Sequence, residues 1–438
     1  MAHADLIVRG HRVYTADGPA AASIHISNGL IESVQPYDHS KGASVFDAGD
    51  YPVLPGLVDS HVHINDPGRA EWEGFETATR AAAAGGVTTL VDMPLNSIPA
   101  TTFVSGWQAK IDAARGRCWV DVGLWGGVVP GNTDQIAGLV QAGVLGFKCF
   151  LTPSGVDEFV NVGESDLRKA APELAKLGAV LLAHAESPAL LRKIAGDPRV
   201  YRNYLDSRPR ESEQEAIALL IEICRSYGNR VHIVHLASAD AVPMLRKARA
   251  EGLPITVETC PHYLVFAAED IPDGTTEFKC APPIRERENA ERLWAALEEG
   301  VIDLVATDHS PCPPSMKAGD FASAWGGIAS IQLSLAIMWR EVEKRGLPVE
   351  RLVQWMSAAP ARLAGLGRRK GAIAAGFDAD IVVWNPNGVG GELQHRHKLT
   401  PYRPSQFPGA VEATFLRGQK VYEQGRFAEG PMGAILRN

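Results

Sequence analysis

The chain has 438 residues, of which 45% are hydrophobic and 21% charged, a composition typical of a globular protein with a large core. Its net charge of -8 offers no basic surface for nucleic acid, and no apolar run reaches the roughly 20 residues that cross a bilayer, so we expect no nucleic-acid or membrane partner. The N-terminus lacks the features of a signal peptide and no Cys-x-x-Cys pair occurs, which favours a cytoplasmic protein with reduced thiols at Cys118, Cys149, Cys224, Cys260, Cys280 and Cys312.

Both ends of the chain are predicted to form β-strands. Short apolar or alternating runs occur there, and Asn28-Gly29 is a tight-hairpin signal between two of them. The candidate strands are Asp5–Gly10, Ser23–Ile26, Leu30–Val34, Ala379–Trp384 and Ala413–Gly418. Two β-rich ends that flank a different middle predict one small β-sandwich domain, built from residues 1–53 and 372–438.

Residues 54–371 alternate between strand-like and helix-like segments. The strand candidates are Gly56–His63, Val87–Met93, Val120–Val129, Gly146–Leu151, Val180–His184, Val231–His235, Ile255–Glu258 and Leu304–Asp308. The helical runs between them include Phe75–Ala84, Ser165–Ala175, Glu213–Cys224 and Asn289–Leu297. Eight strands that alternate with helices predict an α/β fold, a (β/α)8 TIM-type barrel, in which catalytic side chains lie at the C-terminal ends of the strands.

The first of these strands ends in a pair of histidines. His61 and His63 are one residue apart, and alternate side chains of a strand share a face. Both imidazoles can therefore point the same way and hold one metal ion.

Five of the eight predicted strands end in side chains that suit a metal centre. These side chains are His61, His63, Lys148, His184, His235 and Asp308. Imidazole and carboxylate ligands suit zinc and similar divalent ions, but a lysine ammonium has no lone pair for a metal. Once it has reacted with CO2, Lys148 becomes a carbamate (N6-carboxylysine) whose two oxygens can bridge two cations. Two bridged metals would hold a hydroxide nucleophile between them.

Each of these residues also has a structural interpretation. A single histidine at a strand end is more often a satisfied polar residue than a ligand, and Asp308 could simply cap the segment that follows it. Strand alternation places His232 on the face opposite His235, packed against a helix in a structural role. The occurrence of all six residues in barrel order favours the metal centre.

With these residues in this order, the chain resembles the amidohydrolase superfamily. The resemblance is to the cyclic amide hydrolase branch of dihydroorotases, hydantoinases (dihydropyrimidinases) and allantoinases, and within it mostly to allantoinases. The matching segments are Pro55–Glu73, Asp92–Pro99, Gly146–Phe159, Glu258–Leu264, Lys279–Arg285, Ala306–Lys317, Trp325–Ile328 and Gly371–Trp384.

Departures from the related families narrow the expected substrate. Dihydroorotases carry an arginine where this chain has Asn65, and the loss of that cation disfavours a carboxylate substrate. Hydantoinases place a tyrosine where this chain has Pro153, and a serine where it has Ala281. Allantoin remains the best-fitting substrate.

The resemblance implies a complete reaction and site. His61 and His63 would bind the more buried metal, His184 and His235 the second, and the Lys148 carbamate would bridge them. A metal-bridging hydroxide would open the hydantoin ring of allantoin to allantoate, with Asp308 as both ligand and general base. The expected cofactors are two divalent ions, with zinc as first candidate, in a homotetramer. Candidate substrate contacts are Asn96, Cys280, Ala281, Ser310, Gly326 and Gly327.

Two other functions remain open from the sequence. One is a hydantoinase or dihydropyrimidinase that acts on related rings. The other is a non-catalytic scaffold of the hydantoinase-like kind, which the retention of all six ligating residue types disfavours.

Overall fold

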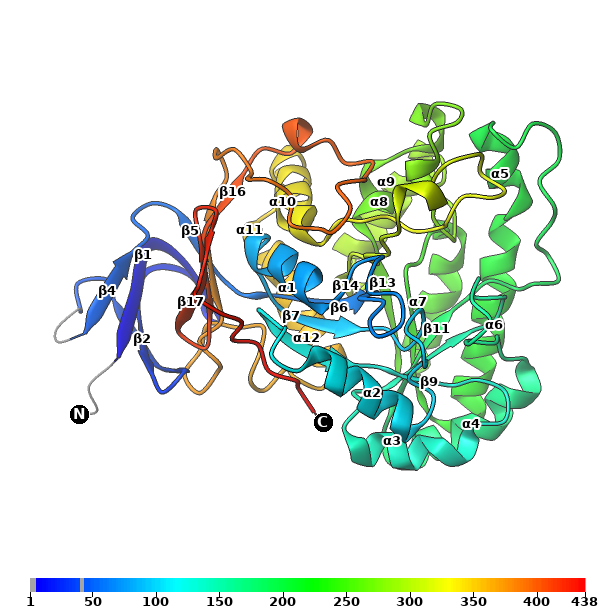
Figure 1. Cartoon of the computed structure of the whole chain (residues 1–438), viewed down its shortest axis with the longest axis horizontal. Helices are drawn as coiled ribbons and strands as arrows, with labels where there is room; N and C mark the ends of the chain where they lie inside the picture. The colour runs from blue at the N-terminus through cyan, green and yellow to red at the C-terminus, as the bar shows by residue number, and fades with distance from the viewer. Residues whose placement is uncertain (1–4, 40–42, 438) are drawn as a thin grey trace.

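A barrel of parallel strands lies beside a sheet to which both ends of the chain contribute (Figure 1). This computed structural model describes residues 5–39 and 43–437. The barrel strands are β6 (Leu57–Val62), β7 (Val87–Asp92), β8 (Asp121–Leu124), β9 (Gly126–Gly127), β10 (Phe147–Phe150), β11 (Val180–His184), β12 (Arg230–Ile233), β13 (Ile255–Thr259) and β14 (Leu304–Val305).

All barrel strands pair in parallel and in chain order. One sheet runs from β6 to β8 and the other from β9 to β14. A parallel bridge between Val62 and His309 brings the first strand beside the chain that follows the last. The predicted TIM-type barrel is therefore confirmed. The single strand expected over Val120–Val129 is two short strands instead, because the chain leaves the regular ladder at Trp125.

Helices follow most of the barrel strands and cover the barrel (Figure 1). The α-helices are α1 (Phe75–Ala84), α2 (Val104–Ala114), α3 (Ile136–Ala142), α4 (Glu164–Leu177), α5 (Tyr201–Ser207), α6 (Arg210–Tyr227), α7 (Val242–Ala250), α8 (Pro261–Val265), α9 (Arg287–Glu298), α10 (Ser334–Lys344), α11 (Val349–Val353) and α12 (Ala359–Leu363). Helix α4 shows why they form: Leu167, Ala170, Ala171 and Leu174 fall on one buried face at helical spacing.

No helix in the described residues is long and apolar enough to cross a membrane.

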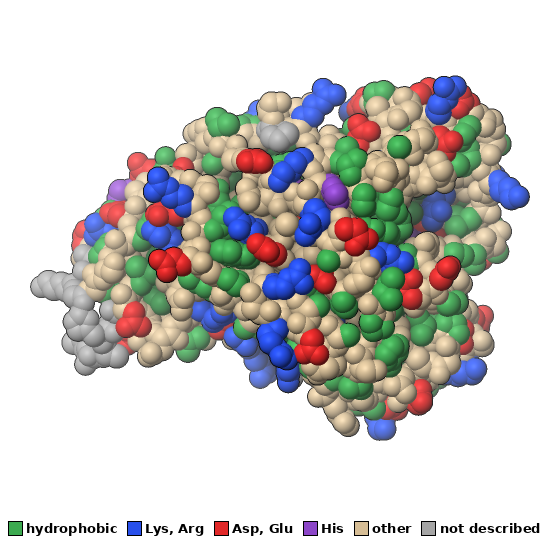
Figure 2. Space-filling view, in the orientation of Figure 1, with side chains coloured by type: hydrophobic (Ala, Val, Ile, Leu, Met, Phe, Trp, Pro, Cys, Tyr) green, Lys and Arg blue, Asp and Glu red, His purple; other side chains and the backbone are tan. Residues whose placement is uncertain are grey.

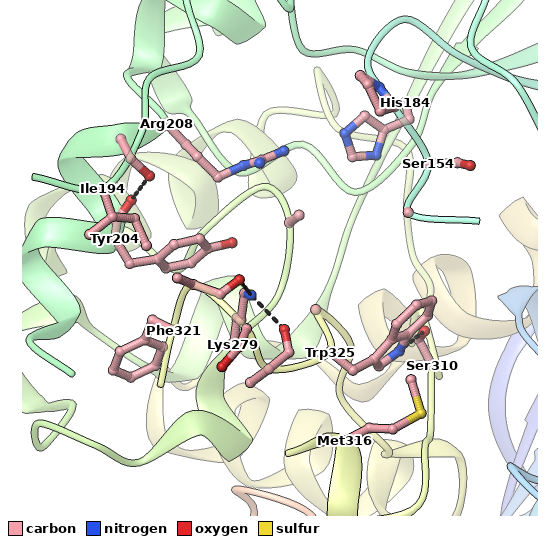
Figure 3. A pocket seen from close by; sticks show the side chains of 18 of the residues that line it. Ser154, His184, Ile194, Tyr204, Arg208, Lys279, Ser310, Met316, Phe321 and Trp325 are labelled. Carbon is pink, nitrogen blue, oxygen red and sulfur yellow. Dashed lines mark hydrogen bonds between the residues drawn. The ribbon is translucent and has the colours of Figure 1, made fainter. Parts of the chain in front are cut away.

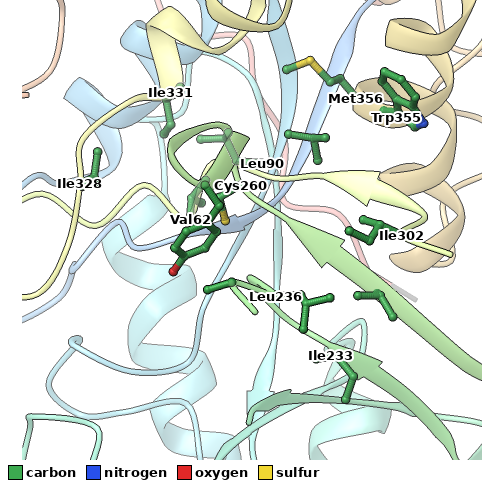
Figure 4. Packing of buried hydrophobic residues seen from close by; sticks show 14 of the residues in the cluster. Val62, Leu90, Ile233, Leu236, Cys260, Ile302, Ile328, Ile331, Trp355 and Met356 are labelled. Carbon is green, nitrogen blue, oxygen red and sulfur yellow. The ribbon is translucent and has the colours of Figure 1, made fainter. Parts of the chain in front are cut away.

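Apolar side chains of the barrel strands and of the surrounding segments pack together in one large cluster (Figure 4). Val62, Leu90 and Ile233 come from three different strands and are almost completely buried. Trp355 and Met356, from the turn of π-helix Gln354–Ala358, belong to the same cluster. Burial of each such side chain stabilises the fold by about 1.5–3 kcal/mol. Because these side chains are closely packed, the ends of the strands are held rigidly.

The second sheet joins the two ends of the chain. Its strands are β1 (Leu6–Thr15), β2 (Gly18–Ser27), β3 (Leu30–Pro36), β4 (Ser44–Asp47), β5 (Pro52–Pro55), β15 (Ile381–Asn385), β16 (Ala410–Leu416), β17 (Gln419–Glu423) and β18 (Arg426–Phe427). Strand β5 pairs with β1 on one side and β15 on the other. Phe46 of β4 packs edge-on against Phe415 of β16 at 5.2 Å, so two layers of the sheet face each other. The domain limits at residues 53 and 372 stay a prediction.

Short-range sequence signals set the hairpins of this sheet. Asn28 and Gly29 have φ of 53° and 80°, the pair of positive values that a tight turn between β2 and β3 requires. Positive and negative side chains are interspersed over the face of the molecule that Figure 2 shows.

A buried ionic cluster connects the barrel to the second sheet. The Nζ of Lys370 lies 2.6 Å from Asp121 of β8, 2.6 Å from Asp380 and 2.9 Å from Asp378. Arg417 pairs with Asp121 as well. Burial opposes the charge of Lys370, but the three carboxylates outweigh it and raise the pKa of the ammonium above its usual value. The three carboxylates could chelate a cation, but Lys370 and Arg417 already compensate them, so we interpret the cluster as structural.

Replacing Lys370 with Met should destabilise the protein by about 3–5 kcal/mol, because it leaves buried carboxylates without their central cation. For a chain of this length that loss is about 3–5 °C in Tm. Arg369→Gln is the control: Arg369 is half-exposed and pairs with Asp378 at 2.8 Å, so its loss should cost about 1 kcal/mol or less. Equal Tm values for the two variants in calorimetry would contradict a structural role for the cluster.

Candidate metal centre

The six residues predicted from the strand ends lie at one end of the barrel. His61 is within β6 and His63 follows it, Lys148 is in β10, and His184 ends β11. His235 and Asp308 follow β12 and β14. All six side chains are buried. Because the C-terminal ends of parallel barrel strands meet at one rim, residues far apart in the chain become neighbours there.

His61, His63 and Asp308 form the first group of potential ligands. One carboxylate oxygen of Asp308 lies 3.1 Å from Nε2 of His61 and 3.3 Å from Nε2 of His63. One donor atom from each residue lies within 4.8 Å of the others. Two imidazoles and a carboxylate that converge in this way are a donor set typical of zinc and related divalent ions.

His184 and His235 form a second group. Nδ1 of His184 lies 3.0 Å from Nε2 of His235, so each ring turns one nitrogen toward the other. The ring of His61 is close to this pair, with its centroid 5.4 Å from that of His235. Burial lowers the pKa of both His184 and His235, and neutral imidazole is the form that ligates.

Lys148 contributes to the electrostatics of both groups. Its Nζ is fully buried, without a hydrogen-bond partner among the described residues, and lies 4.8 Å from the centre of the Phe150 ring. Burial lowers the pKa of Lys148 to about 8, although Asp308 and Glu258 oppose the shift. A buried amine that loses its proton this readily is suited to nucleophilic chemistry.

Glu258, at the end of β13, was not predicted as a site residue. One carboxylate oxygen lies 2.5 Å from Nδ1 of His61, and the other lies 3.0 Å from Nε2 of His232. The backbone N–H of His235 also donates to it, at 3.2 Å. A carboxylate on the far nitrogen of a ligating histidine fixes its tautomer and orientation, so Glu258 leaves Nε2 of His61 free for a metal.

Glu186 has the same relation to His184. Its carboxylate lies 2.7 Å from Nε2 of His184 and accepts two hydrogen bonds from Arg208, at 3.0 and 2.5 Å. Burial opposes ionisation of Glu186, but Arg208 and His184 outweigh it and lower the pKa to about 2. The carboxylate therefore stays charged and leaves Nδ1 of His184 to face His235.

Two of the six strand-end residues have unusual backbone conformations. His235 has φ of 40° and Asp308 has φ of 46°, in the left-handed region that non-glycine residues rarely adopt. Strand β12 ends at Ile233, so alternation does not extend to His235. The prediction that His232 packs against a helix is wrong for this reason: its ring bonds to Glu258 and to Thr256 Oγ1 inside the barrel.

A cavity of about 830 Å³ opens above the histidines (Figure 3). Four of the predicted substrate contacts line it: Asn96, Ala281, Ser310 and Gly326. The other two predicted contacts are not among its lining residues. The carbonyl of Cys280 accepts a hydrogen bond from Tyr204 at 2.7 Å, and Gly327 packs against Ser310 so closely that a Cβ there would lie 2.5 Å from the hydroxyl.

The fold and this donor set define a metal-dependent hydrolase built on a TIM-type barrel. The amidohydrolase family model matches residues 53–421, and the chain belongs to this family. Along its whole length it is 49% identical to the allantoinase of Streptomyces avermitilis, covering 99% of that protein. It is 47% identical to the allantoinase of Saccharomyces cerevisiae over 88% of this chain and 86% of that protein.

Solved structures of related enzymes share the fold. The L-hydantoinase (dihydropyrimidinase) of Arthrobacter aurescens superposes with a TM-score of 0.91 at 31% identity, over 99% of this chain and 100% of that one. The D-hydantoinase of a Thermus species gives a TM-score of 0.85 at 28% identity, over 99% and 98%. Family membership and the converging ligand groups support binding of divalent metal ions.

Glu258→Gln should weaken metal binding by about 10–100-fold, because the amide cannot hold both His61 and His232 in the required tautomers. The measurement is metal content by mass spectrometry after dialysis against a buffered metal concentration. Glu341→Gln is the control, since Glu341 is a buried carboxylate of α10 that pairs with Lys344 and Arg345. Equal metal content in the two variants would rule out an orienting role for Glu258.

Proposed function

We propose that this protein is an allantoinase, which hydrolyses a ring amide of allantoin to give open-chain allantoate. The observation that carries the proposal is 49% identity to an allantoinase over the full chain. All six strand-end residues are present in this chain, and the four histidines and Asp308 line one cavity. The same convergence disfavours a non-catalytic scaffold.

We assign two divalent metal ions, with zinc as first candidate, to the two ligand groups. His61 and His63 would hold one ion and His184 and His235 the other, with Asp308 as a further ligand. When bound, such ions supply an ionised water at neutral pH and polarise the carbonyl group that is attacked.

We assign to Lys148 the role of bridge between the two ions. Its neutral amine would attack the carbon of CO2, forming an N–C bond and releasing one proton, and the product is an anionic carbamate. The support is the burial of Nζ without a described partner and the lowered pKa of the amine. A carbamate anion also removes the cost of burying an uncompensated cation between histidines.

Asp308 is suited to move the proton in this reaction. Burial opposes its ionisation, but His61 and His63 outweigh it and keep the pKa of the carboxyl below its ordinary range. As a general base the carboxylate takes a proton from the attacking water, and then delivers it to the ring nitrogen that leaves.

The wall of the cavity beside the metal ligands offers neutral polar groups to a polar, uncharged ring. Asn96, Ser310 and the main chain at Ala281 and Gly326 supply donors and acceptors. Asn65, where dihydroorotases have arginine, is buried and gives its amide hydrogen to the carbonyl of Pro311 at 3.4 Å. No cation stands at that position to pair with a substrate carboxylate.

Asp308→Asn should retain most of the bound metal and lose at least about 10²-fold in kcat, because an amide cannot accept the proton. Turnover and metal content should be measured on the same preparation. Near-normal kcat would reject the role assigned to Asp308.

A hydantoinase is the second candidate, since the solved relatives above carry that name. Pro153, where hydantoinases carry a tyrosine, lines the cavity and has no hydroxyl group to stabilise an oxyanion. We expect kcat/KM for allantoin to exceed those for hydantoin and dihydrouracil by about 10²-fold or more. A higher value for either of the other rings would make the protein a hydantoinase.

We also propose that the protein works in the cytoplasm as a homotetramer. The six cysteines are all buried and free, which suits a reducing compartment. The homotetramer is proposed from the family resemblance alone, and light scattering of the purified protein should give about four times the 47.0 kDa chain mass.

A further inference from the structure

Two buried lysines, one in each of two loops that contribute to the cavity wall, have no carboxylate partner in the part of the chain that the structure describes. Lys279 is 9% exposed and Lys317 is 8% exposed. Burying an ammonium is costly unless its hydrogens are bonded, so their placement requires compensation from other acceptors. That compensation comes from main-chain carbonyl groups of two loops.

Each lysine binds the loop that carries the other. Lys279 Nζ donates to the carbonyls of Ala324 and Ala322, at 2.5 and 3.2 Å. Lys317 Nζ donates to the carbonyls of Lys279 and Thr276, at 3.0 and 3.1 Å. The hydroxyl of Thr276 adds a bond to the carbonyl of Lys317. Residues 276–281 and 316–327 are thus cross-linked in both directions, and we name this arrangement the lysine clasp.

The cross-linked loops form one wall of the cavity (Figure 3). Ala281 lies at the end of the first loop, and Trp325 and Gly326 belong to the second. A Cβ on Gly326 would be 3.9 Å from the backbone N of Ala281, so the two main chains face each other closely. Trp325 donates its indole N–H to Ser310 Oγ at 3.3 Å. The clasp therefore sets the distance between the main chain at Ala281 and the main chain at Gly326, which lie side by side in the cavity wall.

Both lysines remain cationic near neutral pH. Burial lowers the pKa of Lys279 to about 8, with Arg208 adding to the shift and Asp320 opposing it. Burial also lowers the pKa of Lys317 to about 8, opposed by Cys312 and Cys280. Each retains the ammonium donors that the carbonyls need, and bonds from charged donors are the stronger ones.

We propose that Lys279 and Lys317 are positioning residues for substrate binding. They hold the main chain at Ala281 and Gly326 at the spacing that recognises a planar cyclic ureide, while the metal ligands do the chemistry. The proposal rests on the proposed function for the identity of the ring. This role would explain why two cations are buried where they contact neither the metal ligands nor an acidic side chain in the described structure.

The test compares Lys279→Met and Lys317→Met with Lys169→Met. Lys169 is exposed on α4, is not among the residues that line the cavity, and makes no side-chain bond among the described residues. We expect KM for the ring that the wild type turns over best to rise about 10-fold or more in each clasp variant. kcat should change less than about 3-fold and metal content should not change. Lys169→Met should keep KM within about 2-fold of the wild type.

Two further variants separate positioning from simple loss of structure. The double variant should be little worse than either single variant, because both lysines secure the same pair of loops and their effects are coupled. Lys279→Arg keeps a cation with several donors and should recover part of the lost KM. KM unchanged in both Met variants, or kcat lost together with metal, would overturn the proposal.

Hydrogen–deuterium exchange keeps the proposal testable without any substrate. Faster exchange in residues 276–281 and 316–327 of Lys279→Met or of the milder Thr276→Val, with the barrel strands unchanged, is the expected result. Unchanged exchange in those loops would overturn the clasp, even if allantoin proves to be the substrate. A normal clasp in a protein that does not hydrolyse allantoin would instead contradict the proposed function alone.

Discussion

The site is constrained most strongly by one amine that is buried among imidazoles. The structure gives Lys148 Nζ no hydrogen-bond partner among the described residues, and its nearest compensating charges are those of Asp308 and Glu258. An ammonium in such surroundings opposes any cation that His184 and His235 would hold. A carbamate at the same atom reverses the sign of that charge and provides oxygen ligands. The chemistry of the whole centre therefore depends on the state of this one side chain.

The barrel holds the side chains around Lys148 in fixed positions. Strand pairing places Phe150 beside His184 in register, and their rings stack with centroids 4.6 Å apart. Glu258 and Glu186 then fix the orientation of the histidines from the side away from the cavity. Left-handed backbone at His235 and Asp308 costs of order 1–3 kcal/mol each, and the packed barrel beneath them can bear that cost.

The sequence predicted the strand order and the six residues at the strand ends, because both follow from short-range alternation and from the rule that parallel strands end at one rim. Glu258 was missed, although it closes the predicted strand Ile255–Glu258, and so was Glu186, which follows His184 by two residues. Alternation failed for His232 because regular strand geometry ends before His235.

Cys280 and Gly327 were expected at the substrate, but the local turn directs neither into the cavity. The lysine clasp depends on contacts about forty residues apart in the chain, which no local pattern encodes.

The most direct test is carbon-13 NMR of the metal-loaded protein equilibrated with ¹³C-bicarbonate. We predict a carbamate resonance, separate from those of bicarbonate and dissolved CO2, that is absent from a Lys148→Met variant. A protein that binds two equivalents of metal and turns over substrate without this resonance would contradict the account.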